Sequence, residues 1–404
     1  MTGAQPAAEL EAEPVRDAAA AAVLRARVWL SRTVEPGSAV VYSYVGRVGP
    51  VEAARRIRAG TAPAEVAVLA AARRDQDLVD ADLATAARYG IRILIPEDDE
   101  WPAFPLLRME TATARGVSDL APPLMLWVRG RARLDDLTGQ AVALVGARAA
   151  TPYGDHVASD LAYRLAGRGW TVVSGGASGI DAAAHRGALA AGGPTVAVIA
   201  GGLDTPYPRC NHRLFDQIAE RGLLISEWPP GSPAQRHRFL LRNRLIAGLG
   251  AGSVVVEAGV RSGAKNTARH MRELGGVVMA VPGPVTSAMS VGCHQLVREH
   301  GARLVSSSAD VLEEIGRLGE DLATTPDPER TLEDELDPPA RRVLDGLLVR
   351  TASSPDEVAT AAGVPVGIVL RCLPVLELLG LAESEAGGWK LARGAPERLR
   401  RARG

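Results

Sequence analysis

The chain has 404 residues, and its 46 lysines and arginines nearly balance its 47 acidic residues, giving a formal net charge of −1. This length is too great for one average domain, so we expect two or three domains. Hydrophobic residues make up 47% of the chain and charged residues 23%, which is ordinary for a soluble globular protein.

The cysteines and the apolar segments exclude two classes of protein. Cys210, Cys293 and Cys372 have no C-x-x-C spacing, so neither a disulfide framework nor a zinc site is indicated, and a reducing cytoplasm fits. No run of about 18 apolar residues exists, so we expect no membrane span. The acidic, alanine-rich N-terminus lacks the basic and apolar segments of a signal peptide. The sequence therefore predicts a cytoplasmic protein.

The N-terminal region is predicted to be helical. We expect residues 1–16 to form a disordered tail and residues 17–100 to form a small helical domain. Apolar residues recur at helical spacing in AAAAAVLRARVWLSRT, PVEAARRIRAG and LVDADLATAARYG, with glycines as breaks. The segment GIRILIPEDDEWPAFP then predicts a short strand followed by a proline-rich turn.

Residues 101–317 are predicted to form an α/β domain with a doubly wound, mostly parallel sheet. Six apolar runs are continuous instead of alternating, which is typical of strands buried on both faces. Helical patterns lie between them, so strands and helices alternate. Ligands of such sheets lie beyond the carboxyl ends of the strands. The six runs are AVALVGA, WTVVSGG, TVAVIAGG, GLLISEW, SVVVEAG and VVMAVPG.

The C-terminal region is predicted to be a linker followed by a small domain. Residues 318–338 are acidic and contain several prolines, which is typical of a linker. Residues 339–395 contain three helical patterns and a hairpin-like segment, which together predict a winged helix-turn-helix. Its candidate recognition helix, VPVGIVLRCLPVLELLG, has one basic residue, Arg371. Duplex binding usually takes several phosphate contacts, so we expect this helix to pack or to contact a protein.

Positive charge is concentrated between Gln235 and Arg272. This stretch holds seven arginines, one lysine and two histidines against a single acid, Glu257. It lies among glycine-rich turns between strands and helices, which can offer backbone N–H groups to phosphates. Lys265 is one of only two lysines in the chain, so its compact ammonium stands out. The combination predicts a surface for a polyanion, and a nucleic acid fits best.

Three glycine turns supply candidate contacts to phosphate. Gly146 and Arg148 follow a predicted strand, where an arginine can form two hydrogen bonds to a phosphate, although an ordinary surface arginine fits equally well. The turn SGGASGID combines glycines that allow close backbone approach with the hydroxyls of Ser174 and Ser178. A third turn, at Gly202, leads into another helix.

The second turn matches neither a nucleotide-binding nor a hydrolase motif. Its spacing is not G-x-G-x-x-G, no G-K-[ST] follows, and Ile180 replaces the last glycine of G-x-S-x-G. We expect Asp181 to cap the next helix or to accept from a neighbouring N–H. His185 is interpreted as a packing residue, with a DNA contact as the alternative. Cys293 is interpreted as a small buried hydrophobe, because nothing indicates that His294 acts as its base.

Two further segments carry candidate nucleic-acid contacts. Arginines crowd the start of one apolar helix and can contact phosphates. Phe239 lies among them and could stack on an unpaired base or belong to the core. The turn at Lys265 places short polar side chains and a glycine at a helix N-terminus, which is typical of an anion site.

Seven segments in order resemble the DNA-processing protein A (DprA/Smf) family. They are VGAR-x-x-TPYG, SGGASGIDAAAH, YP-x-x-N, F-x-x-RNRLIAGL, VVVEAG-x-RSGAKNTA, AVPG and VGCHQL. The resemblance is strong from about Trp101 to Ile315 and weaker on either side. It implies an extended Rossmann-like domain flanked by a SAM-like helical domain and a winged helix.

The same resemblance implies a function. Members of this family bind and protect single-stranded DNA without catalysis, help load the RecA recombinase during natural transformation, and are commonly homodimers. No catalytic residue, metal or cofactor is therefore expected. The expected nucleic-acid contacts are Gly146, Arg148, Ser174, Gly175, Gly176, Ser178, Gly202, Arg236, Arg238, Phe239, Arg242, Asn243, Arg244, Ser262, Gly263, Lys265 and Asn266.

An enzyme on the same type of sheet is the alternative hypothesis. A nucleotide phosphoribohydrolase resembling the lysine-decarboxylase-like family would carry P-G-G-x-G-T-x-x-E, in which glycines bind phosphate and the glutamate does the chemistry. Glu257 has no such stretch before it, and Pro282-Gly283-Pro284 lacks the remaining glycines. A sequence-specific regulator that uses the winged helix is a third hypothesis, which the single basic residue Arg371 disfavours.

Overall fold

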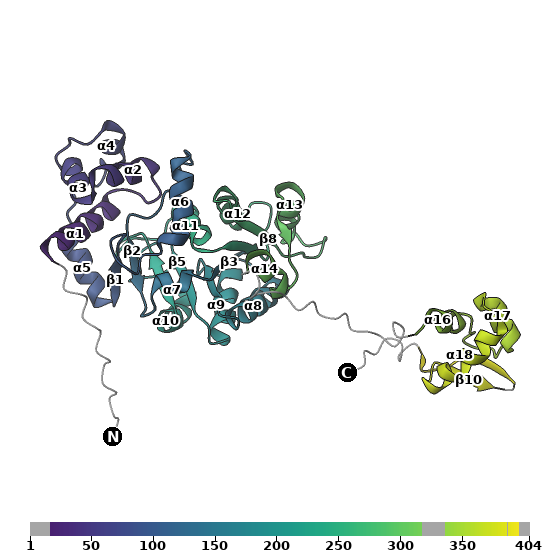
Figure 1. Cartoon of the computed structure of the whole chain (residues 1–404). Coiled ribbons are helices and arrows are strands. Elements are labelled where there is room, and N and C mark those ends of the chain that lie inside the picture. The colour runs from purple at the N-terminus through teal and green to yellow at the C-terminus, as the bar shows by residue number, and fades with distance from the viewer. Residues whose placement is uncertain (1–16, 317–335, 386, 396–404) are drawn as a thin grey trace, which may run out of the picture. The chain divides into compact units, whose positions relative to one another are not determined.

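The computed structural model describes residues 17–316, 336–385 and 387–395, which belong to two compact units (Figure 1). The first unit lies within residues 1–323 and the second within residues 324–404. The tail expected at residues 1–16 and most of the linker expected at residues 318–338 lie outside the described residues.

The first unit is built on a nine-stranded sheet with the order β1-β2-β6-β5-β4-β3-β7-β8-β9. Strands β3 to β9 pair in parallel, while β2 is antiparallel to β6 and β1 is antiparallel to β2. The strands are β1 (Ile91–Leu94), β2 (Leu126–Arg129), β3 (Ala141–Val145), β4 (Thr171–Ser174), β5 (Thr195–Ile199), β6 (Leu223–Ser226), β7 (Gly252–Val255), β8 (Val277–Ala280) and β9 (Arg303–Leu304). The predicted doubly wound, mostly parallel α/β fold is confirmed.

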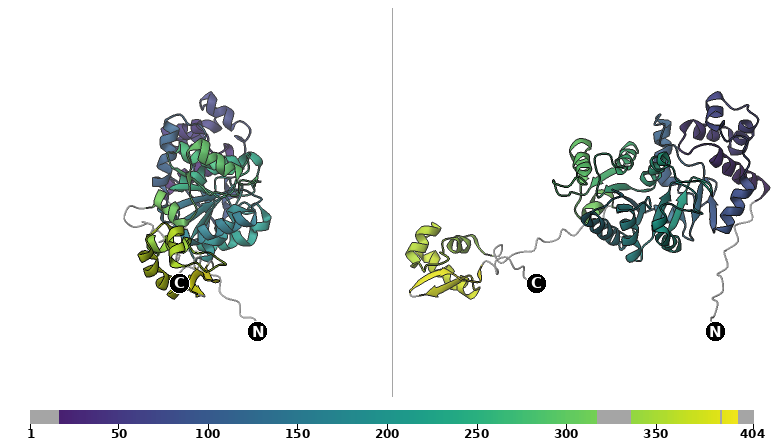
Figure 2. Two further views of the ribbon diagram at one scale, coloured as in Figure 1. Left: turned by 90° about the vertical axis from the view of Figure 1, so that its right-hand side faces the viewer. Right: turned by 180° about the vertical axis from the view of Figure 1, so that it is seen from behind.

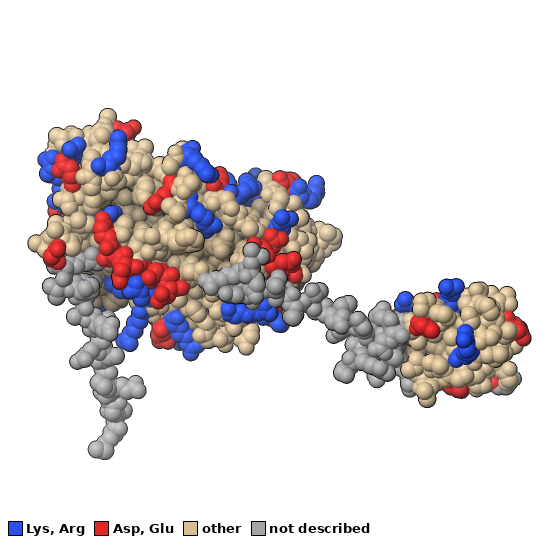
Figure 3. Space-filling model, in the orientation of Figure 1, with Lys and Arg blue, Asp and Glu red and all other residues tan. Residues whose placement is uncertain are grey.

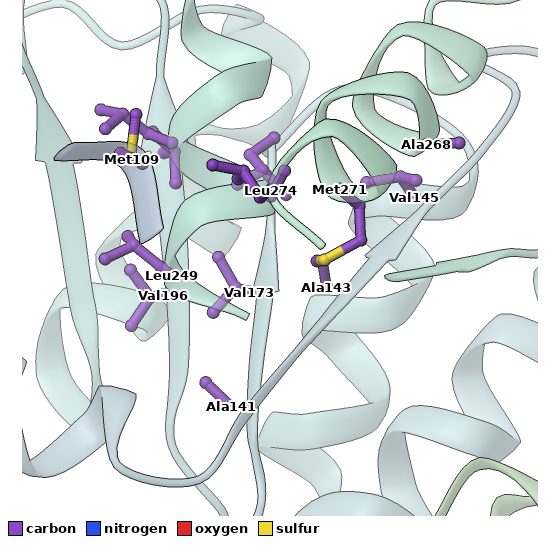
Figure 4. Close-up of a cluster of buried hydrophobic side chains, with 14 of the residues drawn as sticks. Met109, Ala141, Ala143, Val145, Val173, Val196, Leu249, Ala268, Met271 and Leu274 are labelled. Atoms are coloured by element: carbon purple, nitrogen blue, oxygen red, sulfur yellow. The ribbon is translucent and has the colours of Figure 1, made fainter. Parts of the chain in front are cut away.

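Helices cover both faces of this sheet (Figures 1 and 2). Alternate residues of a strand enter different cores: Ala143 joins the cluster with α6, α11, α12 and α13, whereas Leu144 joins the cluster with α8, α9 and α14. Figure 4 shows part of the first cluster, which includes Ala143, Val173 and Met271. The helices are α6 (Ala103–Ala114), α7 (Leu134–Thr138), α8 (Pro152–Ala166), α9 (Ile180–Ala190), α10 (His212–Arg221), α11 (Arg236–Leu249), α12 (Ala264–Glu273), α13 (Val291–His300) and α14 (Ser308–Ile315).

The winding of the chain reverses beside β3. From β3 the chain winds through β4 and β5 to β6, and it then crosses back to add β7, β8 and β9 on the other side. The carboxyl ends of β3 and β7 therefore flank the point where open α/β sheets bind their ligands. Arg148 lies in the loop that follows β3, and Lys265 lies in the first turn of α12, which follows β7.

A bundle of five short helices precedes the sheet. Their common core contains Trp29, Tyr44, Ile57 and Val66, and it continues onto β5 and β6. Strand β1 belongs to the sheet although it precedes residue 101, so the sheet begins before the boundary expected from the sequence. The helices are α1 (Ala18–Thr33), α2 (Ala39–Val48), α3 (Pro50–Arg58), α4 (Ala64–Ala70) and α5 (Val79–Arg88).

The second unit has the three helices and the two-stranded ribbon expected of a winged helix. Its elements are α16 (Pro338–Asp345), α17 (Pro355–Ala362), α18 (Val366–Leu378), β10 (Ala382–Glu385) and β11 (Gly388–Leu391). Among the described residues, no single helix is long and apolar enough to cross a membrane. Helices α17 and α18 meet that criterion only as a pair, and they are bent by 103° at the break between them.

A buried ion pair fastens α11 to the end of β6. Arg244 is fully buried, and its two terminal nitrogens donate to the carboxylate of Glu227 at 2.5 and 2.6 Å. Its Nε donates to the carbonyl of Ala121 at 3.0 Å. A Cβ on Gly37 would lie 3.2 Å from this Nε, so the helical bundle also packs on the guanidinium. One side chain thus joins α11, β6 and the bundle.

Removing Arg244 should destabilise the first unit strongly. Arg244→Ala leaves the Glu227 carboxylate buried without its cation, a change that typically costs about 3–5 kcal/mol. Urea unfolding followed by circular dichroism measures the loss. Arg164→Ala, which breaks an exposed pair with Asp160 on α8, is the matched control and should cost less than about 1 kcal/mol. Equal losses for the two variants would contradict the role given to Arg244.

His185 packs inside the sheet domain. It is fully buried on α9, and its Nδ1 lies 2.8 Å from the hydroxyl of Thr195 at the start of β5. The interpretation of His185 as a packing residue is confirmed. Burial, with a smaller effect of nearby arginines, lowers the pKa of His185 to about 3.

This buried histidine should make stability depend on pH. Between a pH of about 6.5 and about 3 the unfolded chain binds a proton at His185 that the folded chain does not, so stability falls as the pH falls. The slope is about 1.4 kcal/mol per pH unit for one group. We expect His185→Gln to flatten the slope of unfolding free energy against pH between 6 and 4. His156→Gln, at an exposed site on α8, should leave the slope unchanged. An unchanged slope in His185→Gln would contradict the assignment.

Candidate nucleic-acid interface

An arginine and two aromatic residues meet at the carboxyl edge of the sheet. The guanidinium carbon of Arg148, in the loop after β3, lies 4.5 Å from the centre of the Phe239 ring in the first turn of α11. The ring of Tyr207, in the loop after β5, meets Phe239 edge to face at 5.9 Å between centres. These three residues are called the aromatic cluster below. Because parallel strands end at one edge, two loops and the start of α11, which are distant in sequence, converge here.

The aromatic cluster is open to solvent. Arg148 is exposed, Phe239 is half-buried, and Tyr207 is 52% exposed. Cation–π contact holds the guanidinium over the ring. Within the described part of the chain, no carboxylate forms an ion pair with Arg148. Its charge is therefore available to an anion that approaches this edge.

Other exposed arginines lie at the same edge of the sheet. Arg209 follows β5, Arg236 begins α11, and Arg261 follows β7, and all three are exposed. Helix α11 also begins without a side-chain cap, so its first N–H groups add to the positive potential. Tyr207 and Arg209 are not among the contacts expected from the sequence. The sequence did contain an indication of Tyr207 as a contact, since this residue follows a glycine turn at the end of a predicted strand.

Three arginines of the basic stretch are buried. Arg238, Arg242 and Arg244 are 6%, 3% and 0% exposed, and each donates to protein acceptors. On the face in Figure 3, acidic and basic side chains of the first unit are interspersed. The expectation that these guanidinium groups face a ligand is not met in this structure, because the first turns of α11 direct them inward.

The SGGASGID turn is stabilised from within. Asp181 accepts hydrogen bonds from the backbone N–H groups of Gly175 at 3.1 Å and Ala177 at 3.4 Å, as one of the two roles expected for it requires. The buried hydroxyl of Ser174 donates to the carbonyl of Leu144 at 2.6 Å. The N–H groups of Gly175 and Ala177 and the hydroxyl of Ser174 already have acceptors inside the protein. The turn therefore has a structural role, and these three donors are not free to bind a phosphate.

The glycines of this turn are required by close packing. A Cβ on Gly175 would lie 2.5 Å from Arg242 and 2.6 Å from Asp181. Gly176 has a φ of +65°, and a Cβ there would lie 2.7 Å from the Phe215 ring. Burial lowers the pKa of Arg242 to about 10, which the neighbouring carboxylate of Asp181 counteracts. Arg242 donates to the carbonyls of Gly175 and Val198, so it links the ends of β4 and β5.

Gly146 and Gly202, which were also expected to contact the nucleic acid, pack closely against other parts of the protein. A Cβ on Gly146 would lie 2.6 Å from Ile180. Gly202 is buried, and its N–H donates to the carbonyl of Ser232 at 2.9 Å. Ser178 differs from them, because it is half-buried with its hydroxyl 3.5 Å from the sulfur of the exposed Cys210. Ser178 and Cys210 therefore lie at the surface.

Lys265 and the turn before it form hydrogen bonds to other parts of the protein. The Lys265 ammonium donates to Gln295 Oε1 at 2.9 Å and to the carbonyl of Val260 at 3.4 Å, both neutral acceptors. Asn243 donates to the carbonyl of Gly263 at 3.3 Å, which fixes the turn to α11. The last three expected contacts, Ser262, Gly263 and Asn266, are half-buried or exposed. The charge of Lys265 is therefore fixed in place but not neutralised.

The acid that an enzyme on this sheet would use has a structural role. Glu257 is 2% exposed and accepts from the backbone N–H of Thr151 at 2.9 Å and from its hydroxyl at 2.6 Å. It therefore secures the start of α8. Cys293 is buried, and burial raises the pKa of its thiol to about 12, which agrees with its interpretation as a small hydrophobe. The alternative of a nucleotide hydrolase is not favoured.

One group of side chains in the described part of the chain has the spacing of metal ligands. Ligand atoms of Asp119, His270 and Glu273 lie within 4.8 Å of one another. The guanidinium of Arg269 already lies among them, donating to Asp119 at 2.6 Å and to Glu273 at 2.8 Å. An arginine thus supplies the positive charge that a metal ion would bring.

Comparison with known proteins gives the family. The profile of the DNA recombination-mediator protein A family matches residues 92–316, and that of the DprA winged helix domain matches residues 326–388. A Mycobacterium tuberculosis protein, named provisionally as a DNA processing protein DprA, is 49% identical over 91% of this chain and 94% of its own.

Two solved structures resemble the chain. The DNA processing protein A (DprA) of Streptococcus pneumoniae is 33% identical over 73% of this chain and 98% of its own, with a TM-score of 0.59. The DNA processing protein A of Helicobacter pylori, which binds single-stranded DNA, is 27% identical over 56% of this chain and 96% of its own, with a TM-score of 0.48. The family profile across the sheet domain and the identity with the Mycobacterium tuberculosis protein show that the chain belongs to the DNA recombination-mediator protein A (DprA/Smf) family.

Proposed function

We propose that this protein binds single-stranded DNA at the carboxyl edge of its sheet, with the aromatic cluster at the centre of the site. The observation that carries the proposal is the exposed Arg148, which lies over the Phe239 ring without a carboxylate partner among the described residues. A guanidinium forms strong, directional hydrogen bonds to phosphate. An aromatic face beside it offers a stacking surface for a base.

The arrangement favours a single strand over a duplex. Stacking on Phe239 or Tyr207 requires a base whose face is not covered by its neighbours, which a relaxed single strand supplies at little cost. The exposed Arg209, Arg236 and Arg261 lie on separate loops and can follow a flexible backbone. A strand that crosses this edge would meet a positive charge on either side of the aromatic rings.

The proposed contacts fall into two groups. Phe239 and Tyr207 contact bases. The charged and polar contacts to phosphate are Arg148, Arg209, Arg236, Arg261, Lys265, Ser178, Ser262 and Asn266. The other expected residues hold the loops in position, namely Gly146, Ser174, Gly175, Gly176, Gly202, Arg238, Arg242, Asn243, Arg244 and Gly263.

We also propose the cellular role that the family description suggests. A protein that mediates recombination acts before strand exchange, so this chain would protect a single strand in the cytoplasm and help RecA load onto it, as in natural transformation. It would do so by binding, without catalysis, and as a homodimer. The burial of Glu257 supports binding over catalysis, because this acid, which follows β7, is committed to the start of α8.

Affinity should be higher for single strands than for duplex and should fall as salt rises. Each phosphate that an arginine neutralises releases counterions, which gives a slope of about −0.7 per contact in log affinity against log salt for a single strand. Fluorescence anisotropy with an oligothymidine, and with a duplex of the same length, at several salt concentrations measures this. A flat salt response, or tighter duplex binding, would contradict the proposed function.

Changes in the aromatic cluster should weaken binding without unfolding the protein. Arg148→Ala removes a charge-assisted hydrogen bond worth about 1.5–3 kcal/mol, or roughly a 10- to 150-fold loss of affinity. Phe239→Leu removes a stacking surface worth about 1–3 kcal/mol per base while keeping an apolar side chain. Arg164→Ala on α8 is the control and should bind like the unchanged protein. Normal binding by both cluster variants would place the DNA site elsewhere.

A further inference from the structure

A cavity lies next to the start of α11, where Arg238 lines it. Its volume is about 140 Å³, and it is lined by the helical bundle and by the loop that follows β6. The bundle contributes Arg32 and Arg73, and the loop and α11 contribute Trp228, Ser232 and Arg238. One water needs roughly 10–15 Å³ of such space, so the cavity admits a group of the size of a phosphate.

Three arginines line this cavity, and two carboxylates pair with them. Arg32 donates through Nε at 2.6 Å to Asp82, which balances its charge. Arg73 and Arg238 both donate to the same oxygen of Glu35, each at 2.8 Å. Two guanidinium groups therefore share one carboxylate. Among the three lining arginines and the two carboxylates that pair with them, one positive charge is left for an anion.

One nitrogen of Arg238, a residue that lines the cavity, lacks a hydrogen-bond partner. Arg238 is 6% exposed, and its Nε is buried and has no hydrogen-bond partner among the described residues. Its other two nitrogens donate to Glu35 at 2.8 Å and to the carbonyl of Pro233 at 3.2 Å. Buried polar groups in native proteins are nearly always satisfied, so Arg238 retains hydrogen-bonding capacity that its protein partners do not use.

The cavity is joined to the aromatic cluster through the backbone. Arg238 and Phe239 are consecutive residues, and their side chains leave α11 about 100° apart, one towards the cavity and one towards the surface. The N–H of Gly231 donates to Asp204 at 2.9 Å, so the loop that lines the cavity is bonded to the loop that carries Tyr207. The cavity and the aromatic cluster are therefore held in fixed positions by the same helix and the same pair of loops.

We propose that this cavity binds a phosphate group of the DNA strand that lies across the aromatic cluster, with Arg73 and Arg238 as the binding residues. The proposal rests on the proposed function, because it assigns a second anchoring point to the same ligand. The phosphate is either the terminal 5′-phosphate of the strand or one of its internal phosphates, and both offer the same anionic oxygens to the arginines.

The test compares Arg73→Gln with Arg74→Gln in the full chain. Arg73 lies at the cavity and is partly exposed, and Arg238 still pairs with Glu35 when Arg73 is replaced. Arg74 is the next residue, contacts Asp75 at the surface and does not line the cavity, so it is a matched control. Ser232→Glu, which places a carboxylate at the cavity wall, is a second variant. Circular dichroism and thermal unfolding show whether each variant is folded.

Short oligothymidines with a 5′-phosphate and with a 5′-hydroxyl are the probes. For a terminal phosphate, the unchanged protein should prefer the 5′-phosphorylated strand by about fivefold or more, and Arg73→Gln and Ser232→Glu should lose that preference. For an internal phosphate, both variants should weaken long strands of either kind by a similar factor, with a salt slope smaller by about 0.7. Arg74→Gln should behave like the unchanged protein in both cases.

The outcomes separate this inference from the proposed function. If Arg148→Ala weakens binding while folded Arg73→Gln and Ser232→Glu bind both probes like the unchanged protein, the cavity proposal is wrong and the proposed function stands. If the unchanged protein binds no single strand, the proposed function itself fails. Equal losses in Arg73→Gln and Arg74→Gln would show a general effect of charge and would also overturn the cavity site.

Discussion

The carboxyl edge of the sheet depends on the guanidinium of Arg242. Parallel strands end in backbone carbonyls that point towards the ligand side, and the buried Arg242 donates to two of them, at Gly175 after β4 and at Val198 of β5. The carboxylate of Asp181 accepts the N–H groups of the same turn. Without these contacts, polar groups at the ends of two central strands would be buried and unsatisfied, which is costly inside a protein. The loops that carry Arg148 and Tyr207 extend from this fixed edge.

Helix α11 divides its basic residues between structure and binding. Arg242 and Arg244 point inward and join strand ends, β6 and the helical bundle, whereas Arg236 and the ring of Phe239 point outward. Arginine suits the inward role because its planar group donates to several acceptors at once and stays charged when buried. The helix therefore presents a small exposed surface in a well-fixed position. A rigid framework of this kind reduces the conformational entropy that binding must overcome.

Much of the fold could be predicted because parallel strands buried on both faces have continuous apolar sequences. The continuous apolar runs at β3 to β8 and the glycines after them predicted the order of elements and the ligand edge. The antiparallel pairing of β1 and β2 could not be predicted, since four-residue strands carry little periodicity. The sequence also could not show which arginine side chains point into the protein and which point to solvent. The partner of Arg238 is Glu35, 203 positions away, and only the tertiary fold brings the two together.

The exposed thiol of Cys210 is a site at which this protein can be labelled selectively. It lies at the carboxyl edge beside Ser178, in the same segment as Tyr207, whose ring contacts Phe239. Cys293 is buried with a raised pKa, and burial also raises the pKa of the half-buried Cys372 in the second unit. Since the thiolate is the form that reacts, an alkylating dye at neutral pH should attach first at Cys210. The native chain, with no engineered cysteine, can thus carry an environment-sensitive fluorophore at the rim of its own binding edge.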